Sequence, residues 1–200
     1  MARAEYWNHN VHYQPVILSA VPEDCGPALD VGCGDGMLVR RLAERCAEVT
    51  GIDRDPRMIA LARARGHGRT GFIEADFLTY PFEAASFDFA CANTSLHHMD
   101  FAAALTAMAR ILRPGGRLAV VGLAADKSIG DLLVAAPGVP VNLVYRAICR
   151  QGESGAPIMD PQMTWREVRA AATQTLPGVR YRRHRHLLWR YSLLWNKPAD

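Results

Sequence analysis

The 200-residue sequence lacks several features that would assign it to a specialised class of protein. Its five cysteines include no CxxC pair, which argues against a zinc site and a disulfide framework, so we expect them to be reduced and mostly buried. No apolar run approaches the length of a membrane span, and the polar, aromatic N-terminus has no signal-like apolar core. We therefore expect a cytoplasmic protein with neither a membrane segment nor a metal site.

The composition is that of an ordinary globular domain. Hydrophobic residues make up 50% of the chain and charged residues 22%. The net charge of +3 is too small to indicate nucleic acid by itself. Without a repeat or a low-complexity linker, the length fits a single domain spanning residues 1–200.

Short apolar runs alternate with amphipathic stretches along most of the chain, which is typical of an α/β domain with a mostly parallel sheet. The pattern predicts strands over residues 28–31, 48–52, 71–74, 87–92 and 117–122. It predicts helices over 37–45, 56–65 and 101–112, with a turn at 114–116. A capping box at residues 164–167 predicts a helix to about residue 175, and strands are expected over 179–186 and 188–197.

The strongest local signal is the segment Ala-Leu-Asp-Val-Gly-Cys-Gly-Asp-Gly at residues 28–36. A strand runs into Gly32, Gly34 and Gly36 and then into a helix, which lets a ligand approach the backbone closely. Asp53 follows the second strand, where an acidic residue of a Rossmann-like unit accepts hydrogen bonds from ribose. Asp55 is better placed to cap the next helix. The two signals together predict an adenosine-containing cofactor.

The glycine spacing is GxGxG rather than the GxGxxG of dinucleotide sites. With Asp30 before it, this segment resembles motif I of the class I S-adenosylmethionine-dependent methyltransferases. Three later segments resemble motifs of that family in the same order: residues 74–77, residues 87–98 and residues 112–118. The resemblance covers roughly residues 28–122. It implies a Rossmann-like, seven-stranded, doubly wound sheet with a C-terminal edge hairpin.

The resemblance also implies a cofactor, S-adenosylmethionine, and residues that hold it. Its methionine end is expected at Asp30, Gly32, Cys33 and Gly34, and its ribose at Asp53, with Arg54 and Met58 flanking the adenosine. Asp76 and Phe77 are expected at the adenine. Asn93 and Thr94 are expected at the end of the fourth strand, near the methyl group.

His97 and His98 follow the fourth strand and are the candidate catalytic residues. A neutral imidazole can accept a proton from a methyl acceptor near pH 7. The alternative is that the pair only shapes the site, and the sequence does not decide between the two roles.

The chain ends are expected to form the acceptor site. Residues 1–24 predict a helical lid in which Tyr13 and His12 face the cofactor and Tyr6 or Trp7 the acceptor, although the same aromatics could pack the helix onto the sheet. Residues 123–163 are expected to form a cap. The basic, aromatic run at 179–191 alternates with period two, which favours an edge hairpin with largely solvated Arg and His side chains.

These features favour an enzyme that transfers a methyl group to oxygen, nitrogen or carbon of a small molecule. An RNA or protein methyltransferase is a second hypothesis, but Asn93 is followed by Thr94-Ser95 instead of the Pro-Pro-aromatic sequence of many amine methyltransferases. A cofactor-binding partner protein without catalytic activity is a third, and a nicotinamide dehydrogenase, which the glycine spacing opposes, is a fourth. No nucleic-acid or membrane partner is expected, and the oligomeric state is left open.

Overall fold

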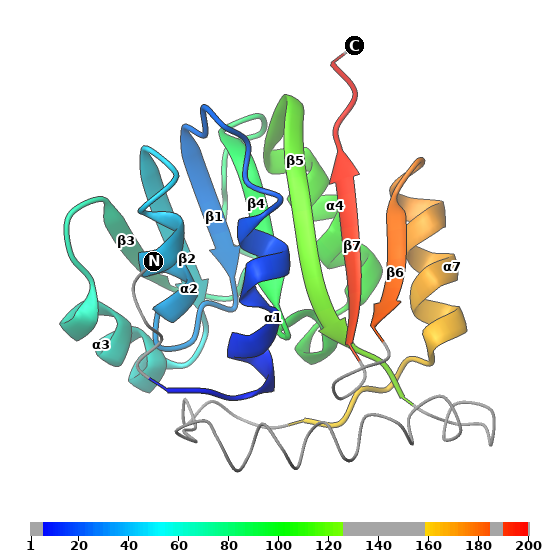
Figure 1. Cartoon of the computed structure of the whole chain (residues 1–200), viewed down its shortest axis with the longest axis horizontal. Coiled ribbons are helices and arrows are strands. Elements are labelled where there is room, and N and C mark those ends of the chain that lie inside the picture. Colours follow the sequence, from blue (N-terminus) through cyan, green and yellow to red (C-terminus); the bar gives the residue numbers. More distant parts are fainter. Residues whose placement is uncertain (1–5, 126–158, 185–189, 200) are drawn as a thin grey trace.

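The computed structural model describes residues 6–125, 159–184 and 190–199, which form a seven-stranded sheet with helices on both faces (Figure 1). The strand order is β3-β2-β1-β4-β5-β7-β6. Strands β1 to β5 are parallel, and β7 runs antiparallel between β5 and β6. The predicted doubly wound sheet with its edge hairpin is confirmed. The strands are β1 (Pro27–Val31), β2 (Glu48–Asp53), β3 (Thr70–Glu74), β4 (Phe87–Asn93), β5 (Leu112–Leu123), β6 (Arg180–His184) and β7 (Arg190–Asn196).

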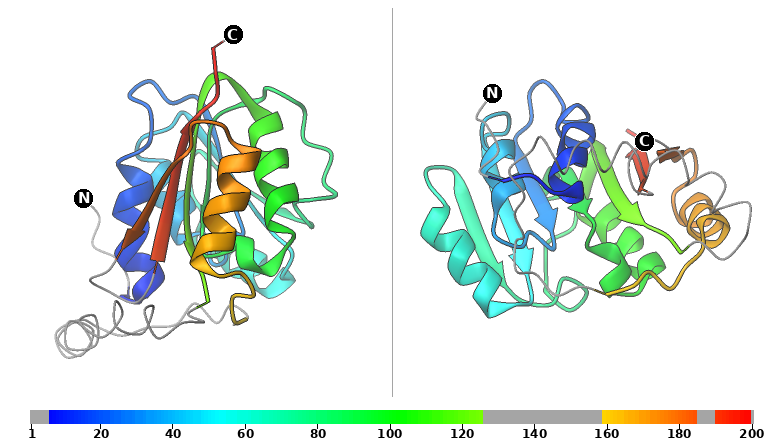
Figure 2. Two further views of the ribbon diagram at one scale, coloured as in Figure 1. Left: turned by 90° about the vertical axis from the view of Figure 1, so that its right-hand side faces the viewer. Right: turned by 60° about the horizontal axis from the view of Figure 1, so that its bottom comes forward.

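The helices divide between the two faces of the sheet. Helices α1, α2 and α3 cover one face, and α4 and α7 cover the other (Figures 1 and 2). A short 3-10 helix, η1, follows β4. The helices are α1 (His9–Leu18), α2 (Met37–Leu42), α3 (Pro56–Arg65), η1 (Leu96–His98), α4 (Phe101–Ile111) and α7 (Trp165–Thr175).

The sequence of the central strand β4 is nearly continuous in apolar residues because both of its faces are covered by helices. Phe89 and Cys91 pack in the core under α1 and α2, whereas Ala90 and Ala92 pack in the core under α4. All four side chains are fully buried. A strand covered by helices on both faces has no solvated side, so its residues need not alternate between apolar and polar.

Two predicted helix starts are confirmed in detail. The Asp55 side chain accepts a hydrogen bond from the Arg57 backbone N–H, and Pro56 occupies the first helical position of α3. Helix α7 begins with the reciprocal capping box between Thr164 and Glu167. These local signals set where each helix begins, and therefore which residues remain in the preceding loops.

The turn predicted at residues 114–116 is wrong in one respect, because these residues belong to β5. Leu112 pairs with Phe87 and Arg117 with Phe89, so β5 carries extra residues that bulge out of the ladder. Gly115 takes a left-handed conformation there, with φ 75°. The segment stays attached to the sheet because the Gly115 N–H donates to the Lys197 carbonyl at 3.1 Å.

The N-terminal helix α1 packs onto the sheet and begins near the site edge of the fold. Tyr13 and Ile17 are buried against the sheet, while the beginning of α1 lies at the edge of the sheet where the parallel strands end. Most of the expected cap, residues 126–158, lies outside the described residues. None of the helices within the described ranges combines the length and apolar composition that crossing a bilayer requires.

Candidate active site

A cavity of about 480 Å³ lies at the carboxyl edge of the parallel strands, where open α/β sheets bind their ligands. It gathers residues from loops that are far apart in the sequence. The structure brings together at this cavity twelve of the predicted site residues: Asp30, Gly32, Cys33, Gly34, Asp53, Arg54, Asp76, Phe77, Asn93, Thr94, His97 and His98.

Three residues that were expected at the cofactor do not line the cavity: His12, Tyr13 and Met58. Tyr13 is only 5% exposed because α1 turns its ring onto the sheet, where it lies 5.1 Å from the ring of His184. Met58 is buried in the first turn of α3, on the side that packs against β2 and β3, together with Ala62 one turn later. The structure therefore does not place these side chains at the cavity, contrary to the expectation.

The glycine-rich turn after β1 has the backbone that the sequence predicted. Gly32 and Gly34 have φ values of 72° and 54°, in the left-handed region that glycine adopts without strain. A side chain on Gly32 would collide with Ser95, whereas the space around Gly34 is open to 4 Å. The turn is thus packed on one side and accessible on the other, where a ligand can contact its backbone.

Asp53 connects the turn to β2. One carboxylate oxygen accepts from the Gly34 N–H and the other from the Asp55 N–H, both at 2.9 Å. Asp53 therefore holds the turn in place, and its position at the cavity also fits the expected contact with ribose.

Asp30 is an ionisable residue at the cavity whose side chain is almost completely buried, with 1% of its surface exposed. Burial raises the pKa of its carboxyl to about 7, while the Cys91 thiol, which donates to it at 3.5 Å, acts in the opposite direction. The nearby charge of Asp53 raises the pKa further. A buried carboxyl of this kind complements a cationic ligand, such as the ammonium and sulfonium groups of S-adenosylmethionine.

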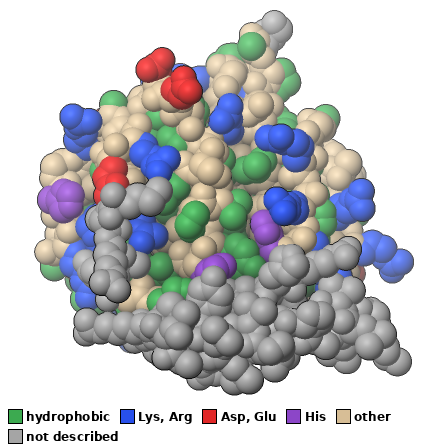
Figure 3. Space-filling model, in the orientation of Figure 1, with side chains coloured by type: hydrophobic (Ala, Val, Ile, Leu, Met, Phe, Trp, Pro, Cys, Tyr) green, Lys and Arg blue, Asp and Glu red, His purple; other side chains and the backbone are tan. Residues whose placement is uncertain are grey.

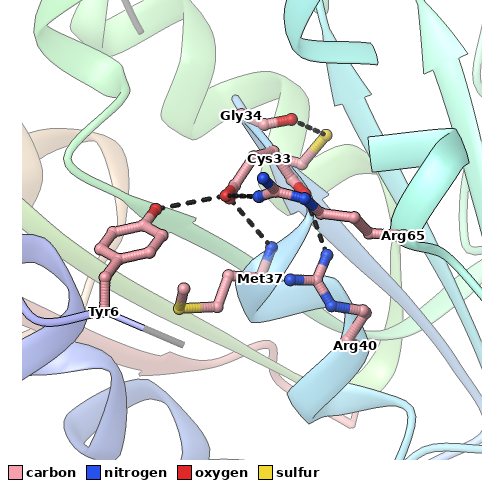
Figure 4. A network of polar contacts seen from close by, with 7 residues as sticks. Tyr6, Cys33, Gly34, Met37, Arg40 and Arg65 are labelled. Carbon is pink, nitrogen blue, oxygen red and sulfur yellow. Dashed lines mark hydrogen bonds and ion pairs between the residues drawn. The ribbon is translucent and has the colours of Figure 1, made fainter. Parts of the chain in front are cut away.

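Asp35 ties the N-terminal segment to the glycine-rich turn (Figure 4). Its carboxylate accepts hydrogen bonds from the Tyr6 hydroxyl at 3.3 Å and from the Arg65 guanidinium at 2.7 Å. The backbone carbonyl of Asp35 accepts from Arg40 at 2.9 Å. Tyr6 also lines the cavity, so this network attaches the N-terminal segment to the cavity wall.

The loop after β4 presents polar atoms that have no partner in the described part of the chain. These buried atoms are Asn93 Oδ1, Thr94 Oγ1 and His97 Nδ1. Thr94 also has a positive φ of 61°, held by a hydrogen bond from its N–H to the Val121 carbonyl at 2.7 Å. Strain in a non-glycine residue beside unpaired polar atoms is typical of a binding site.

His97 and His98 lie on η1, with ring centroids 4.1 Å apart. The pKa of His97 falls to about 4, mainly through burial and also through the nearby charges of His98 and Arg190. The pKa of His98 is lowered by burial and by Arg54, while Asp53 opposes this shift. Both imidazoles are therefore neutral at pH 7.

Arg190 and Asn10 are among the cavity residues that the sequence did not predict. Arg190 was expected to be solvated with the rest of its hairpin, yet it is 7% exposed and lines the cavity. Its guanidinium donates to Asn10 Oδ1 at 2.8 Å, and the Asn10 carbonyl accepts from Asn93 Nδ2 at 3.1 Å. Because residues 179–191 are basic and mostly alternate with period two, nothing in the sequence indicated that the Arg190 side chain points inward.

Known proteins resemble the chain over most of its length. A methyltransferase domain model matches residues 29–120. An uncharacterized methyltransferase of Mycobacterium tuberculosis is 34% identical over 196 residues, covering 96% of this chain and 98% of that protein. A ubiquinone biosynthesis O-methyltransferase of Xylella fastidiosa is 40% identical over 129 residues, covering 61% of this chain and 51% of that protein.

The fold is also that of a solved structure. A crystal structure described as an S-adenosylmethionine-dependent methyltransferase of Methanosarcina mazei superposes with a TM-score of 0.65 at 20% identity, covering 93% of this chain and 98% of that one. Together with the glycine-rich turn, the buried acid before it and the acid after β2, these similarities confirm the resemblance seen in the sequence. The chain belongs to the class I S-adenosylmethionine-dependent methyltransferases.

Proposed function

We propose that this methyltransferase transfers the methyl group of S-adenosylmethionine to a small-molecule acceptor, bound between the loop after β4 and the N-terminal segment. The observation that carries the proposal is the continuous cavity, which joins the cofactor residues to His97, Asn10 and Arg190. The similarity to an O-methyltransferase of ubiquinone biosynthesis supports an acceptor oxygen, although this chain spans only 51% of that protein.

The proposed roles follow from the positions of the groups. The cofactor supplies an activated methyl group, so the protein has to orient the acceptor and exclude water. Gly32, Gly34 and Asp30 would hold the methionine portion, Asp53 the ribose, and Asp76 with Phe77 the adenine. Tyr6 and Asp35 would close the site on the N-terminal side.

The two histidines are proposed to orient the acceptor and to receive its proton. His97 is neutral but weakly basic, with a pKa of about 4, so it accepts a hydrogen bond more readily than a proton. His98 is less buried and lies near Asp53, whose charge opposes the loss of basicity. Replacing each histidine by Ala separates the roles: unchanged turnover in both variants would exclude proton transfer to either.

The surface supports a small molecule over a nucleic acid as the acceptor. On the face shown in Figure 3, Lys and Arg side chains are spread among other residues instead of gathering in one patch. In the C-terminal hairpin, Arg183 stacks on the Trp165 ring at 4.1 Å from its centroid. We further propose a cytoplasmic location, which the free, buried thiols of the four described cysteines support.

Gly34→Ala tests the cofactor site. Its methyl group would enter the open space above the turn, so binding of S-adenosylhomocysteine, measured by calorimetry, should weaken by about tenfold or more. Gly68→Ala is the matched control, because Gly68 also has a left-handed backbone and open surroundings but does not line the cavity. Both variants carry the same backbone strain of about 1–2 kcal/mol. Equal binding by the two variants would refute the proposed cofactor position.

The acceptor is tested with radiolabelled S-adenosylmethionine and a panel of phenols, amines and organic acids. Methyl transfer to any of these acceptors that is lost in Gly34→Ala and retained in Gly68→Ala supports the proposed function. Tight cofactor binding with transfer only to RNA or protein would overturn the assignment of a small-molecule acceptor.

A further inference from the structure

Arg190 places a buried positive charge in the part of the cavity farthest from the cofactor residues along the sheet. It is the first residue of β7 and pairs with Leu123 at the end of β5. Its side chain is 7% exposed and its guanidinium donates to Asn10 Oδ1 at 2.8 Å. The Asn10 oxygen that accepts this hydrogen bond is neutral and orients the guanidinium.

The strand order separates Arg190 from the glycine-rich turn. That turn follows β1, and β4 and β5 lie between β1 and β7. Three strand spacings correspond to about 14 Å at the backbone. All of the predicted cofactor residues that line the cavity lie near the carboxyl ends of β1, β2, β3 or β4 or in the loops that follow these strands. Arg190 therefore belongs to the acceptor half of the cavity.

Arg190 also lies close enough to His97 to affect it. Its charge is one of the causes that lower the pKa of His97, after burial and His98. The Arg190 and Asn93 side chains share Asn10 as a hydrogen-bond partner, which connects β7 to the end of β4. A molecule in contact with Arg190 is thus held next to the candidate catalytic histidine and to the loop after β4.

We propose that the methyl acceptor carries a carboxylate group and that Arg190 binds it. This inference rests on the proposed function, since it names the chemical class of the acceptor. A guanidinium is planar and always charged, and its fork of N–H donors matches a carboxylate in two parallel hydrogen bonds. Burial strengthens such a pair because little water competes for either group.

Binding of a carboxylate would also change His97. The negative charge offsets the charge of Arg190, so the pKa of His97 rises and the imidazole becomes a better proton acceptor. The bound acceptor would thus increase the basicity of His97, the residue proposed to receive its proton. A neutral analogue of the same shape would bind without raising the pKa of His97.

Benzoate and benzamide are matched probes, because they share one shape and differ in charge. Both are titrated by calorimetry into the protein saturated with S-adenosylhomocysteine, so that the cofactor's own carboxylate site is filled. We expect benzoate to bind about tenfold more tightly than benzamide. Arg190→Gln should remove that preference, whereas Arg166→Gln, an exposed position on α7, should keep it. Arg190→Lys should keep only part of it, since a single ammonium lacks the fork geometry.

Three results would overturn the inference. Equal affinity for benzoate and benzamide in the native protein would show that Arg190 does not distinguish a carboxylate from a neutral amide. Weakened binding of S-adenosylhomocysteine in Arg190→Gln, with the benzoate preference intact, would assign Arg190 to the cofactor. Tighter binding of phenyl phosphate than of benzoate would replace the carboxylate by a phosphate.

A structural effect of Arg190→Gln is separated by a measurement on the native protein. The pKa of His97, followed by NMR of its ring protons, should rise on addition of benzoate and stay constant with benzamide. Failure of the protein to bind S-adenosylhomocysteine at all would refute the proposed function instead, and comparison of native protein with Arg190→Gln in a benzoate titration without this ligand would then report on Arg190.

Discussion

Asp30→Asn should stabilise the ligand-free protein while weakening its cofactor site. Asp30 is 1% exposed, and burial raises the pKa of its carboxyl from 3.8 to about 7. Below pH 4 the group is protonated in both the folded and the unfolded chain. Between pH 4 and 7 the unfolded chain releases this proton while the folded protein retains it, so the native protein loses stability as the pH rises.

The size of this effect follows from the shift. About three pKa units at 1.36 kcal/mol each correspond to about 4 kcal/mol. An asparagine keeps an oxygen for the Cys91 thiol and never ionises, so it avoids this loss. The advantage of the variant should therefore be small at pH 4 and reach about 4 kcal/mol at pH 8.

Urea unfolding of both proteins, without ligand and over pH 4–8, measures the difference. An advantage that is the same at every pH would refute the reasoning, because it would show that ionisation of Asp30 is not its cause. Saturating S-adenosylmethionine should reduce the advantage, since a cation beside Asp30 favours the charged carboxylate of the native protein. The variant is thus expected to be more stable but to bind the cofactor less tightly, a trade-off that active-site substitutions often show.

The other predictions concern proton release, the N-terminal segment and one helix start. At pH 7 the binding of S-adenosylmethionine should release about half a proton as Asp30 ionises, measured by calorimetry in buffers of different ionisation enthalpy; zero release would contradict the pKa of about 7. Tyr6→Phe removes the hydrogen bond to Asp35 and should weaken S-adenosylhomocysteine about fivefold at an unchanged melting temperature; unchanged affinity would show that this segment does not close the site. Thr164→Ala removes the capping box of α7 and should lower stability by about 1 kcal/mol, or about 2–4 °C in melting temperature, without affecting cofactor binding.

The local signals of the sequence were reliable wherever backbone chemistry decides the outcome. The glycine spacing at residues 32–36 predicted a turn with left-handed residues, and Asp55-Pro56 predicted a helix start. The bulge in β5 was misread as a turn before the strand, because Pro and Gly mark an irregular backbone without saying whether its hydrogen bonds continue into a sheet.

The direction of individual side chains was harder to predict. Tyr13 and Met58 lie on elements that reach the site, but the rotation of each helix turns them into the core. Arg190 was misjudged for the opposite reason. It stands in a basic hairpin with solvated neighbours such as Arg180 and Arg182, and only its pairing with Leu123 carries it to the cavity.

By itself, the sequence determined the family, the fold class and most of the residues that line the cavity after β1, β2, β3 and β4. These depend on short motifs whose glycines, caps and acids act within a few residues of one another. Only the tertiary structure showed the other part of the cavity, where α1, the end of β4 and the first residue of β7 meet. Asn10 and Arg190 are 180 residues apart, and their contact depends on the packing of α1 onto the sheet next to the antiparallel strand β7.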